Sequence, residues 1–183
     1  MTTQQSTTAA NVALVRTSLD AFNEGDIDAC AALLSPDFMM NMAGLPPRQG
    51  PDVWRQGVEV IKRGFPDLHA DIDDVLAEGD QVALRLTFRG THQGEFLGTP
   101  ATGRAIEYVS HEFYRIADGL FAEEWICSDL ATLHGQLTAA STGVLGGTRD
   151  RDHGHRGAGA GEVDPGEGGA RQTPKDLGAG RVR

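Results

Sequence analysis

The first half of the chain places apolar residues three or four positions apart, which is the spacing of amphipathic helices. The predicted helices cover residues 11–23, 27–34 and 51–64. Asn11 and Asp26 would cap the first two helices, and Pro51 would open the third. A short apolar strand at residues 38–42 and a loop rich in Gly and Pro at residues 43–51 separate the second helix from the third.

Beyond Pro66 the apolar spacing falls to two positions, as in strands. The predicted strands cover residues 68–77, 81–89, 105–116 and 120–128. Ala117-Asp118-Gly119 would form a tight hairpin turn between the last two strands, and Asp129 would cap a closing helix over residues 129–137. Three helices followed by a mainly antiparallel sheet predict an α+β fold. A curved sheet over these helices would enclose a pocket for a small ligand.

The side chains that can form a core are confined to the first part of the chain. Every Phe, Trp, Tyr, Ile, Met and Cys lies at or before Cys127, and half of the 24 glycines follow residue 140. The last segment cannot bury enough apolar surface to offset the entropy of ordering its backbone. We therefore expect a flexible N-terminus at residues 1–10, one folded domain at residues 11–140 and a disordered tail at residues 141–183.

Charge restricts the choice of partners. The formal net charge of −10 combines +1 on residues 141–183, from seven basic and six acidic side chains, with −11 on the rest. An acidic folded unit binds phosphate backbones poorly, so no nucleic-acid partner is expected.

The sequence also predicts a compartment. Residues 1–10 lack the apolar core of a signal peptide, and no apolar run reaches the ~20 residues that span a bilayer, so no membrane partner is expected. Cys30 and Cys127 are predicted to be buried, reduced thiols. We expect a soluble, cytoplasmic protein. The sequence has no metal-binding Cys/His cluster and no Gly-rich phosphate loop, so neither a metal nor another cofactor is predicted.

The segment from Arg89 to Arg104 is dense in turn-forming residues. Glycines stand at positions 90, 94, 98 and 103 and a proline at position 100, with His92 among them. Shorter motifs elsewhere are Ala21-Phe22-Asn23, Ser35-Pro36-Asp37-Phe38, Gly50-Pro51, Phe65-Pro66-Asp67, Arg115-Ile116-Ala117-Asp118-Gly119, Glu124-Trp125, Asp129 and Gln136-Leu137. In this order, the motifs resemble the SnoaL-like polyketide cyclases, also called ester cyclases, of the nuclear transport factor 2-like superfamily. The resemblance extends from Asn11 to Leu137.

This resemblance implies a cone-shaped α+β domain that dimerises through its sheet. It implies proton transfer next to a carbonyl, without a metal or organic cofactor, as in an intramolecular aldol ring closure. The substrate would be a small apolar or polycyclic molecule. In the characterised cyclases an aspartate on the last strand is the general acid/base, beside a histidine on the preceding strand. Alignment on the Arg115–Gly119 motif places Ile126 at the aspartate position and Glu112 at the histidine position.

Because isoleucine cannot transfer protons, two hypotheses remain open. One is an enzyme of the cyclase or isomerase type that uses another acid/base. The other is a non-catalytic module of the same fold that binds a small ligand or dimerises. The sequence alone does not decide between them.

Glu112 is the first candidate acid/base. If its face of the strand lines the pocket, apolar surroundings would raise its pKa toward neutrality. Alternatively, it is solvated or paired with Arg115 or Arg85. His111 lies one residue away on the opposite face, and it would take the histidine position only if a bulge shifts the register.

Two further residues are candidate catalytic groups. His92 would either orient a substrate carbonyl or hydrogen-bond the backbone of its loop. Asp129 would serve either as an alternative acid/base or as a helix cap. The aromatic residues that would pack in the core or line the pocket are Phe22, Trp54, Phe65, Phe96, Tyr114 and Trp125. Ile126 and His111 are further candidate substrate-binding residues.

One strand face carries Arg85, Thr87 and Arg89 at alternating positions. These side chains would either bind an anionic substrate group or pair with the many acidic side chains on the water-facing side of the sheet.

Overall fold

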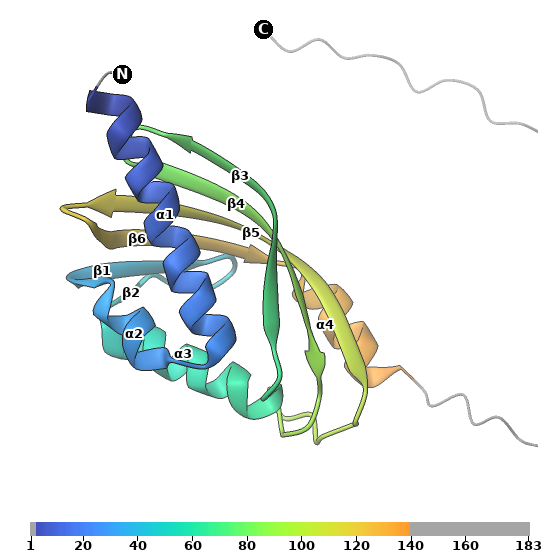
Figure 1. Cartoon of the computed structure of the whole chain (residues 1–183). Helices are drawn as coiled ribbons and strands as arrows, with labels where there is room; N and C mark the ends of the chain where they lie inside the picture. Colours follow the sequence, from blue (N-terminus) through green and yellow to red (C-terminus); the bar gives the residue numbers. More distant parts are fainter. Residues whose placement is uncertain (1–2, 140–183) are drawn as a thin grey trace, which may run out of the picture. The chain divides into compact units, whose positions relative to one another are not determined.

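A computed structural model of the protein describes residues 3–139 (Figure 1). Its elements are α1, Thr3–Glu24; α2, Ile27–Ala32; β1, Leu34–Met42; β2, Arg48–Gln49; α3, Pro51–Gly64; β3, His69–Glu78; β4, Gln81–Thr91; β5, Ala105–Ala117; β6, Leu120–Ser128; and α4, Leu130–Thr138. The predicted tail, residues 141–183, lies outside the described residues.

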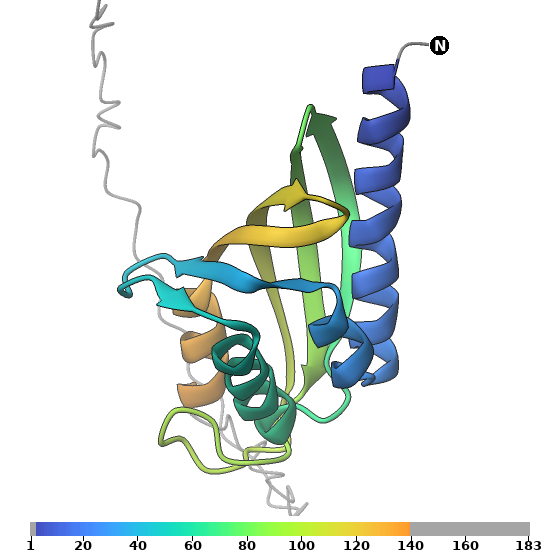
Figure 2. The same ribbon diagram turned by 90° about the vertical axis from the view of Figure 1, so that its left-hand side faces the viewer.

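The strands form one six-stranded sheet in the order β2-β1-β6-β5-β4-β3. All neighbouring strands are antiparallel except β1 and β6, which run parallel. The sheet is curved, with α1 running along one side of it (Figure 2). Helix α1 packs against β3 and β4, α3 against β1, and α4 against β5. The predicted α+β class, with N-terminal helices and a curved sheet, is confirmed.

The hydrophobic core fills the space between the helices and the inner face of the sheet. Along β5, alternate residues from Ile106 to Ile116 are buried, while Glu107, His111 and Phe113 between them are exposed. This alternation is the period-two pattern expected of a strand with one buried and one solvated face.

The predicted hairpin between the last two strands is present. Asp118 and Gly119 connect β5 to β6, and both have positive φ angles, 53° and 76°. Two consecutive positive φ angles are the geometry of the type I′ turn, whose twist matches that of the strands it joins. This turn sets the register of the pairing between β5 and β6.

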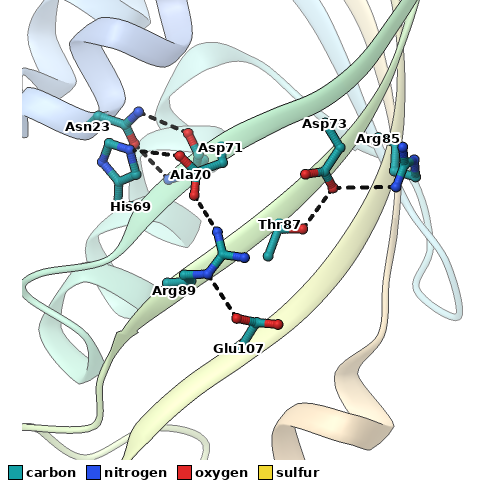
Figure 3. Close-up of polar contacts among 9 residues, drawn as sticks. All are labelled: Asn23, His69, Ala70, Asp71, Asp73, Arg85, Thr87, Arg89 and Glu107. Atoms are coloured by element: carbon teal, nitrogen blue, oxygen red, sulfur yellow. Dashed lines mark hydrogen bonds and ion pairs between the residues drawn. The ribbon is translucent and has the colours of Figure 1, made fainter.

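Helix α1 differs from the prediction. It begins at Thr3, so Asn11 lies inside the helix rather than at its cap, and residues 3–10 belong to the helix. The Asn11 side chain is buried and donates a hydrogen bond to the Gly79 carbonyl at 3.1 Å. At the other end of α1, the Asn23 side chain exchanges two hydrogen bonds with the Ala70 backbone, at 2.8 and 3.0 Å (Figure 3). These bonds attach the helix to edge strand β3.

Two other local predictions can be compared with the structure. Asp26 caps α2 as expected, because its Oδ1 accepts a hydrogen bond from the Ala29 N–H at 2.9 Å. The helix ends at Ala32, however, and Leu34 is already the first residue of β1. Within the predicted loop after β1, the short strand β2 pairs with β1.

The two cysteines lie in different environments. Cys30 is buried in α2, whereas Cys127 is exposed on β6 and lies opposite His111 in the register with β5. Both are free thiols, but the prediction that both are buried is wrong for Cys127, which projects from the outer face of the sheet.

Within residues 3–139, no helix has the length and apolar character needed to cross a bilayer.

The outer face of β3, β4 and β5 carries paired polar side chains (Figure 3). Arg89 donates to Glu107 at 2.8 Å and also pairs with Asp71. The Thr87 hydroxyl donates to Asp73 at 2.7 Å. Arg89 therefore pairs with acidic side chains of the sheet, which is the second of the two alternatives predicted for this strand face.

Candidate functional site

The inner face of the hairpin formed by β5 and β6 carries a row of polar side chains within the apolar core. The strand register places Ser110 opposite Ser128, Glu112 opposite Ile126, and Tyr114 opposite Glu124. Because successive residues on one strand face are two positions apart, all six side chains share the same side of the hairpin. On the flanking strands the residues opposite the carboxyls are Leu84, which faces Glu112, and Met40, which faces Glu124.

Glu112 lies inside the domain, with 6% of its surface exposed. The Ser110 hydroxyl donates to its Oε1 at 2.9 Å, and the Tyr114 hydroxyl donates to its Oε2. Burial raises the pKa of Glu112, while the hydrogen bonds from Tyr114 and Ser110 oppose that rise. Each bond stabilises the charged form, so the carboxylate is held in one position and can still accept a proton.

The alternative pairing of Glu112 with an arginine is absent from the described residues. Arg115 donates to Glu123 at 2.8 Å, and Arg85 lies 3.7 Å from Asp73. Both arginines therefore form ion pairs with carboxylates other than that of Glu112.

Glu124 is the residue of this cluster that sequence reasoning did not select. It is 5% exposed, and its Oε2 has no hydrogen-bond partner among the described residues. Burial raises its pKa well above the ordinary value, and the nearby charge of Glu112 raises it further, against a weaker opposing interaction with Tyr114. Glu124 is thus a buried carboxyl that favours its neutral form.

A register shift explains why Glu124 was missed. Phe121 and Glu124 are three residues apart, so strict alternation would place them on opposite faces of β6. The pairing shifts between Arg115 and Ile116, which leaves one extra residue on β6 and lets both side chains point inward. The available signal was Ile126: once it is placed opposite Glu112, Glu124 two positions earlier must share its face.

The structure does not bring His111 together with Glu112. His111 is exposed on the outer face of β5, opposite Cys127, and the pairing of β4 with β5 runs without a bulge past this residue. The sheet therefore separates the two side chains.

His92 is fully buried in the loop between β4 and β5. Its backbone N–H donates to the Arg104 carbonyl at 2.8 Å, and its Nδ1 accepts from the Thr102 N–H at 3.3 Å. Its ring lies against Phe65, with centroids 5.2 Å apart. Within residues 3–139, its Nε2 has no hydrogen-bond partner. These contacts hold the loop closed on the end of α3, and none of them connects His92 to Glu112.

Asp129 caps α4. Its Oδ1 accepts from the Thr132 N–H at 2.9 Å, and its Oδ2 accepts from the Thr132 hydroxyl at 2.7 Å. These bonds lower the pKa of Asp129, which is exposed to solvent. A carboxylate with a lowered pKa is a weak proton acceptor, so the geometry suits the capping alternative.

The candidate pocket residues belong mostly to the core, but Trp125 is 37% exposed opposite Phe113 on the outer face of the sheet, so the expectation for it is wrong. Phe65, Phe96 and Tyr114 are buried, and Phe22, Trp54 and Ile126 are half-buried against the same apolar cluster. The Phe65 and Phe96 rings meet edge to face at 5.0 Å. Of these residues, Tyr114 contacts Glu112 through a hydrogen bond and Ile126 lies directly opposite it.

Two hollows lie outside the carboxyl cluster. One, of about 40 Å³, lies between the loop before β5 and helix α4, and its lining is Phe96, Leu97, Thr99, Leu130, Leu133, His134 and Leu137. The other is an open groove beside the first turns of α1 and the turn after β3. Neither includes Glu112 or Glu124 in its lining, so a ligand pocket beside these carboxyls stays a prediction. No three or more His, Cys, Asp or Glu side chains within residues 3–139 are grouped as metal ligands would be.

The sequence model of the SnoaL-like polyketide cyclase family matches residues 12–137, which is most of the chain. The chain belongs to this family.

Known members of the SnoaL-like family give this assignment more detail. The aklanonic acid methyl ester cyclase DnrD of Streptomyces peucetius is 29% identical over 116 residues, covering 61% of this chain and 79% of the relative. The aklanonic acid methyl ester cyclase DauD of Streptomyces sp. strain C5 is 31% identical over 111 residues, covering 58% and 68%. The solved structure of TsrD from Streptomyces laurentii superposes with a TM-score of 0.64 and 34% identity, covering 72% of this chain and 96% of TsrD.

Proposed function

We propose that this SnoaL-like protein is a cofactor-independent enzyme that transfers a proton next to a carbonyl. The reaction would be an intramolecular aldol cyclisation or an isomerisation of a small apolar or polycyclic molecule. The observation that carries this proposal is Glu112, a buried carboxyl with a raised pKa that is held by two hydroxyl donors. The relatives DnrD and DauD are aklanonic acid methyl ester cyclases, so aklanonic acid methyl ester is the first compound to test.

The role proposed for Glu112 follows from its surroundings. In its ionised form it removes a proton from a carbon next to a carbonyl, and in its protonated form it returns one. The Ser110 and Tyr114 hydroxyls fix the orientation of its carboxylate. The apolar neighbours Leu84 and Ile126 keep water from competing for the proton.

A second candidate function is favoured by Ile126. This apolar side chain stands at the position that the resemblance assigns to the catalytic aspartate, which is compatible with a module that binds a small apolar ligand without converting it. The two functions differ in whether bound ligand is turned over.

The test compares turnover and binding of aklanonic acid methyl ester by the full chain and by Glu112→Gln. Glutamine keeps the shape of the side chain but cannot accept the proton, so we expect kcat to fall by roughly 10²–10⁴-fold. Glu107→Gln is the matched control, because Glu107 lies on the same strand but on the exposed outer face. Product analysis by liquid chromatography measures turnover, and calorimetry measures binding.

Full turnover by Glu112→Gln would remove Glu112 from the mechanism. Binding of the ester without product from the unaltered chain would favour the ligand-binding alternative for this compound.

We also propose that the protein forms a homodimer through the outer face of its sheet and that it resides in the cytoplasm. The dimer is supported by Phe113 and Trp125, which lie opposite each other on this face and are 51% and 37% exposed. The location is supported by two cysteines without a disulfide, which is the usual state in a reducing compartment.

A further inference from the structure

The Tyr114 hydroxyl connects two buried carboxyl groups. It donates to Glu112 on its own strand and also interacts with Glu124, its direct neighbour on β6. We propose that Glu112 and Glu124 act as a pair that holds one proton, with Glu112 as the base and Glu124 as the acid that protonates the acceptor carbonyl oxygen. The catalytic part of this inference rests on the proposed function; the sharing of one proton does not.

The hydrogen bonds decide which member carries the charge. Glu112 accepts from Ser110 and from Tyr114, and both bonds favour a carboxylate. Glu124 leaves its Oε2 without a donor among the described residues, and an ionised oxygen in that position would be a buried charge without compensation. A protonated Glu124 avoids this cost and has an O–H that it can donate to a substrate oxygen.

Among residues 3–139, the groups around the pair provide no counter-charge. Strands β4 and β1 place Leu84 and Met40 opposite the two carboxyls. The nearby ionisable side chains on the same face are Tyr108 and Tyr114, and burial together with the charge of Glu112 raises the pKa of both. No Lys, Arg or His in the described part of the chain forms an ion pair with either carboxyl.

The helices on this side contribute apolar side chains to the core, among them Val12, Val15, Leu19, Val53, Trp54 and Ile61. Within residues 3–139, the interaction with Tyr114 favours a charge on Glu124, but it is weaker than the opposing effects of burial and of the Glu112 charge. Two carboxyls at close quarters in such surroundings titrate in separate steps, and one of them stays neutral.

The proposed reaction balances within one substrate molecule. The Glu112 carboxylate takes the proton from the carbon next to one carbonyl, and the released electron pair forms the new bond to the second carbonyl carbon. The oxygen of that second carbonyl takes the proton from Glu124. Tyr114 then accepts the proton on Glu112 as it passes its own to Glu124, which restores the starting state. The substrate is isomerised, and no oxidant, reductant or other reactant is consumed.

The proton is measured first without substrate, by infrared titration of the full-length chain in deuterated buffer. We expect a protonated-carboxyl band that persists to neutral pH and is lost in Glu124→Gln. Glu112→Gln should retain the band but shift its loss to lower pH, because the charge of Glu112 raises the pKa of Glu124. Glu123→Gln is the control, since Glu123 pairs with Arg115, and it should leave the band unchanged.

Turnover is measured second, with aklanonic acid methyl ester across a range of pH. Glu124→Gln should lower kcat by roughly 10²-fold, as expected for loss of a general acid, with a smaller change in KM. The unaltered chain should gain activity as Glu112 ionises and lose it as Glu124 ionises. The variant should lack that loss at alkaline pH. Glu124→Asp should recover part of the activity.

The two measurements separate the possible failures. A band that survives in Glu124→Gln, or a Glu124 that is already ionised at pH 5, would overturn the shared proton whatever the activity. A band that behaves as expected in a protein without turnover of the ester would leave the shared proton intact and count against both the proposed function and the catalytic part of the inference. Unchanged kcat in Glu124→Gln would overturn the acid role alone.

Discussion

Glu124 loses hydration on folding, and among residues 3–139 its Oε2 gains no hydrogen-bond donor in return. Its pKa in the folded protein lies well above the value of about 4.3 that a glutamate has in an unfolded chain. Between those two pKa values the folded state binds more protons than the unfolded state. Stability must therefore fall as the pH rises through this window. The residue thus weakens the fold near neutral pH, which is the behaviour expected of a group kept for function rather than for stability.

Glu124→Gln should remove much of this pH dependence. Glutamine has nearly the same shape and cannot ionise, so the variant should unfold at a higher temperature than the unaltered chain at pH 8. The difference in unfolding temperature between the two proteins should shrink as the pH is lowered toward 4, because the Glu124 side chain is then neutral in the folded protein, as glutamine is. Thermal unfolding monitored by circular dichroism between pH 4 and pH 8 measures the effect; roughly 1 kcal/mol corresponds to a shift of ~2–8 °C in domains of this size.

Glu123→Gln serves as the control for this experiment as well. Glu123 pairs with Arg115 on the outer face, so its loss should leave the slope of stability against pH in place. Parallel curves for Glu124→Gln and the unaltered chain would contradict the raised pKa.

Among the elements, the loop between β4 and β5 depends on close approach to α3. The N–H groups of Gln93 and Gly94 both donate to the Gly64 carbonyl at the end of α3, at 2.9 and 3.0 Å. A Cβ on Gly94 would overlap the Arg63 carbonyl oxygen, which is backbone and cannot rotate away. The glycine-rich segment therefore docks on the end of α3, and Gly94 is required there because a side chain would not fit.

Gly94→Ala should destabilise the domain by about 2 kcal/mol or more, since overpacking against fixed atoms typically costs 1–3 kcal/mol. Gly98→Ala is the comparison, because Gly98 has a φ of 79° and open space around its Cβ position. It should cost only the strain of a left-handed residue, about 1 kcal/mol. Urea unfolding of both variants measures the two costs, and equal costs would show that the close approach at Gly94 is not limiting.

Elements with a clear period were predictable from the sequence. The alternation along residues 105–116 placed Glu112 and Tyr114 on one face of β5, and Asp118-Gly119 located the turn. The predictions that failed concern residues whose positions depend on partners distant in the chain. Asn11 is not a cap because the helix begins at Thr3, and its side chain bonds instead to Gly79, 68 residues away. Phe121 and Glu124 can both point inward because the pairing of β6 with β5 shifts between them. Neither cause leaves a local pattern in the sequence.

At the scale of the whole molecule, the outer face of the β5–β6 hairpin exposes large apolar side chains among its polar ones. Val109, Phe113 and Trp125 are at least 36% exposed, and Phe113 and Trp125 are directly paired. Adjacent β3 and β4 instead carry charged pairs on the same side of the sheet (Figure 3). Contiguous exposed apolar side chains rimmed by polar ones are typical of protein–protein contacts.

We therefore expect a dimer in sedimentation-velocity measurements of the unaltered chain. Phe113→Glu should convert it to a monomer, because the substitution places a charge at the centre of the apolar face in each copy. Leu76→Glu is the matched control: Leu76 is 70% exposed on edge strand β3, away from the hairpin, and its replacement should leave the dimer intact. If Phe113→Glu sediments as the unaltered chain does, the dimer does not use this face. Because Phe113 points away from Glu112, turnover by a folded monomeric variant would also show whether the carboxyl pair functions within a single copy of the chain.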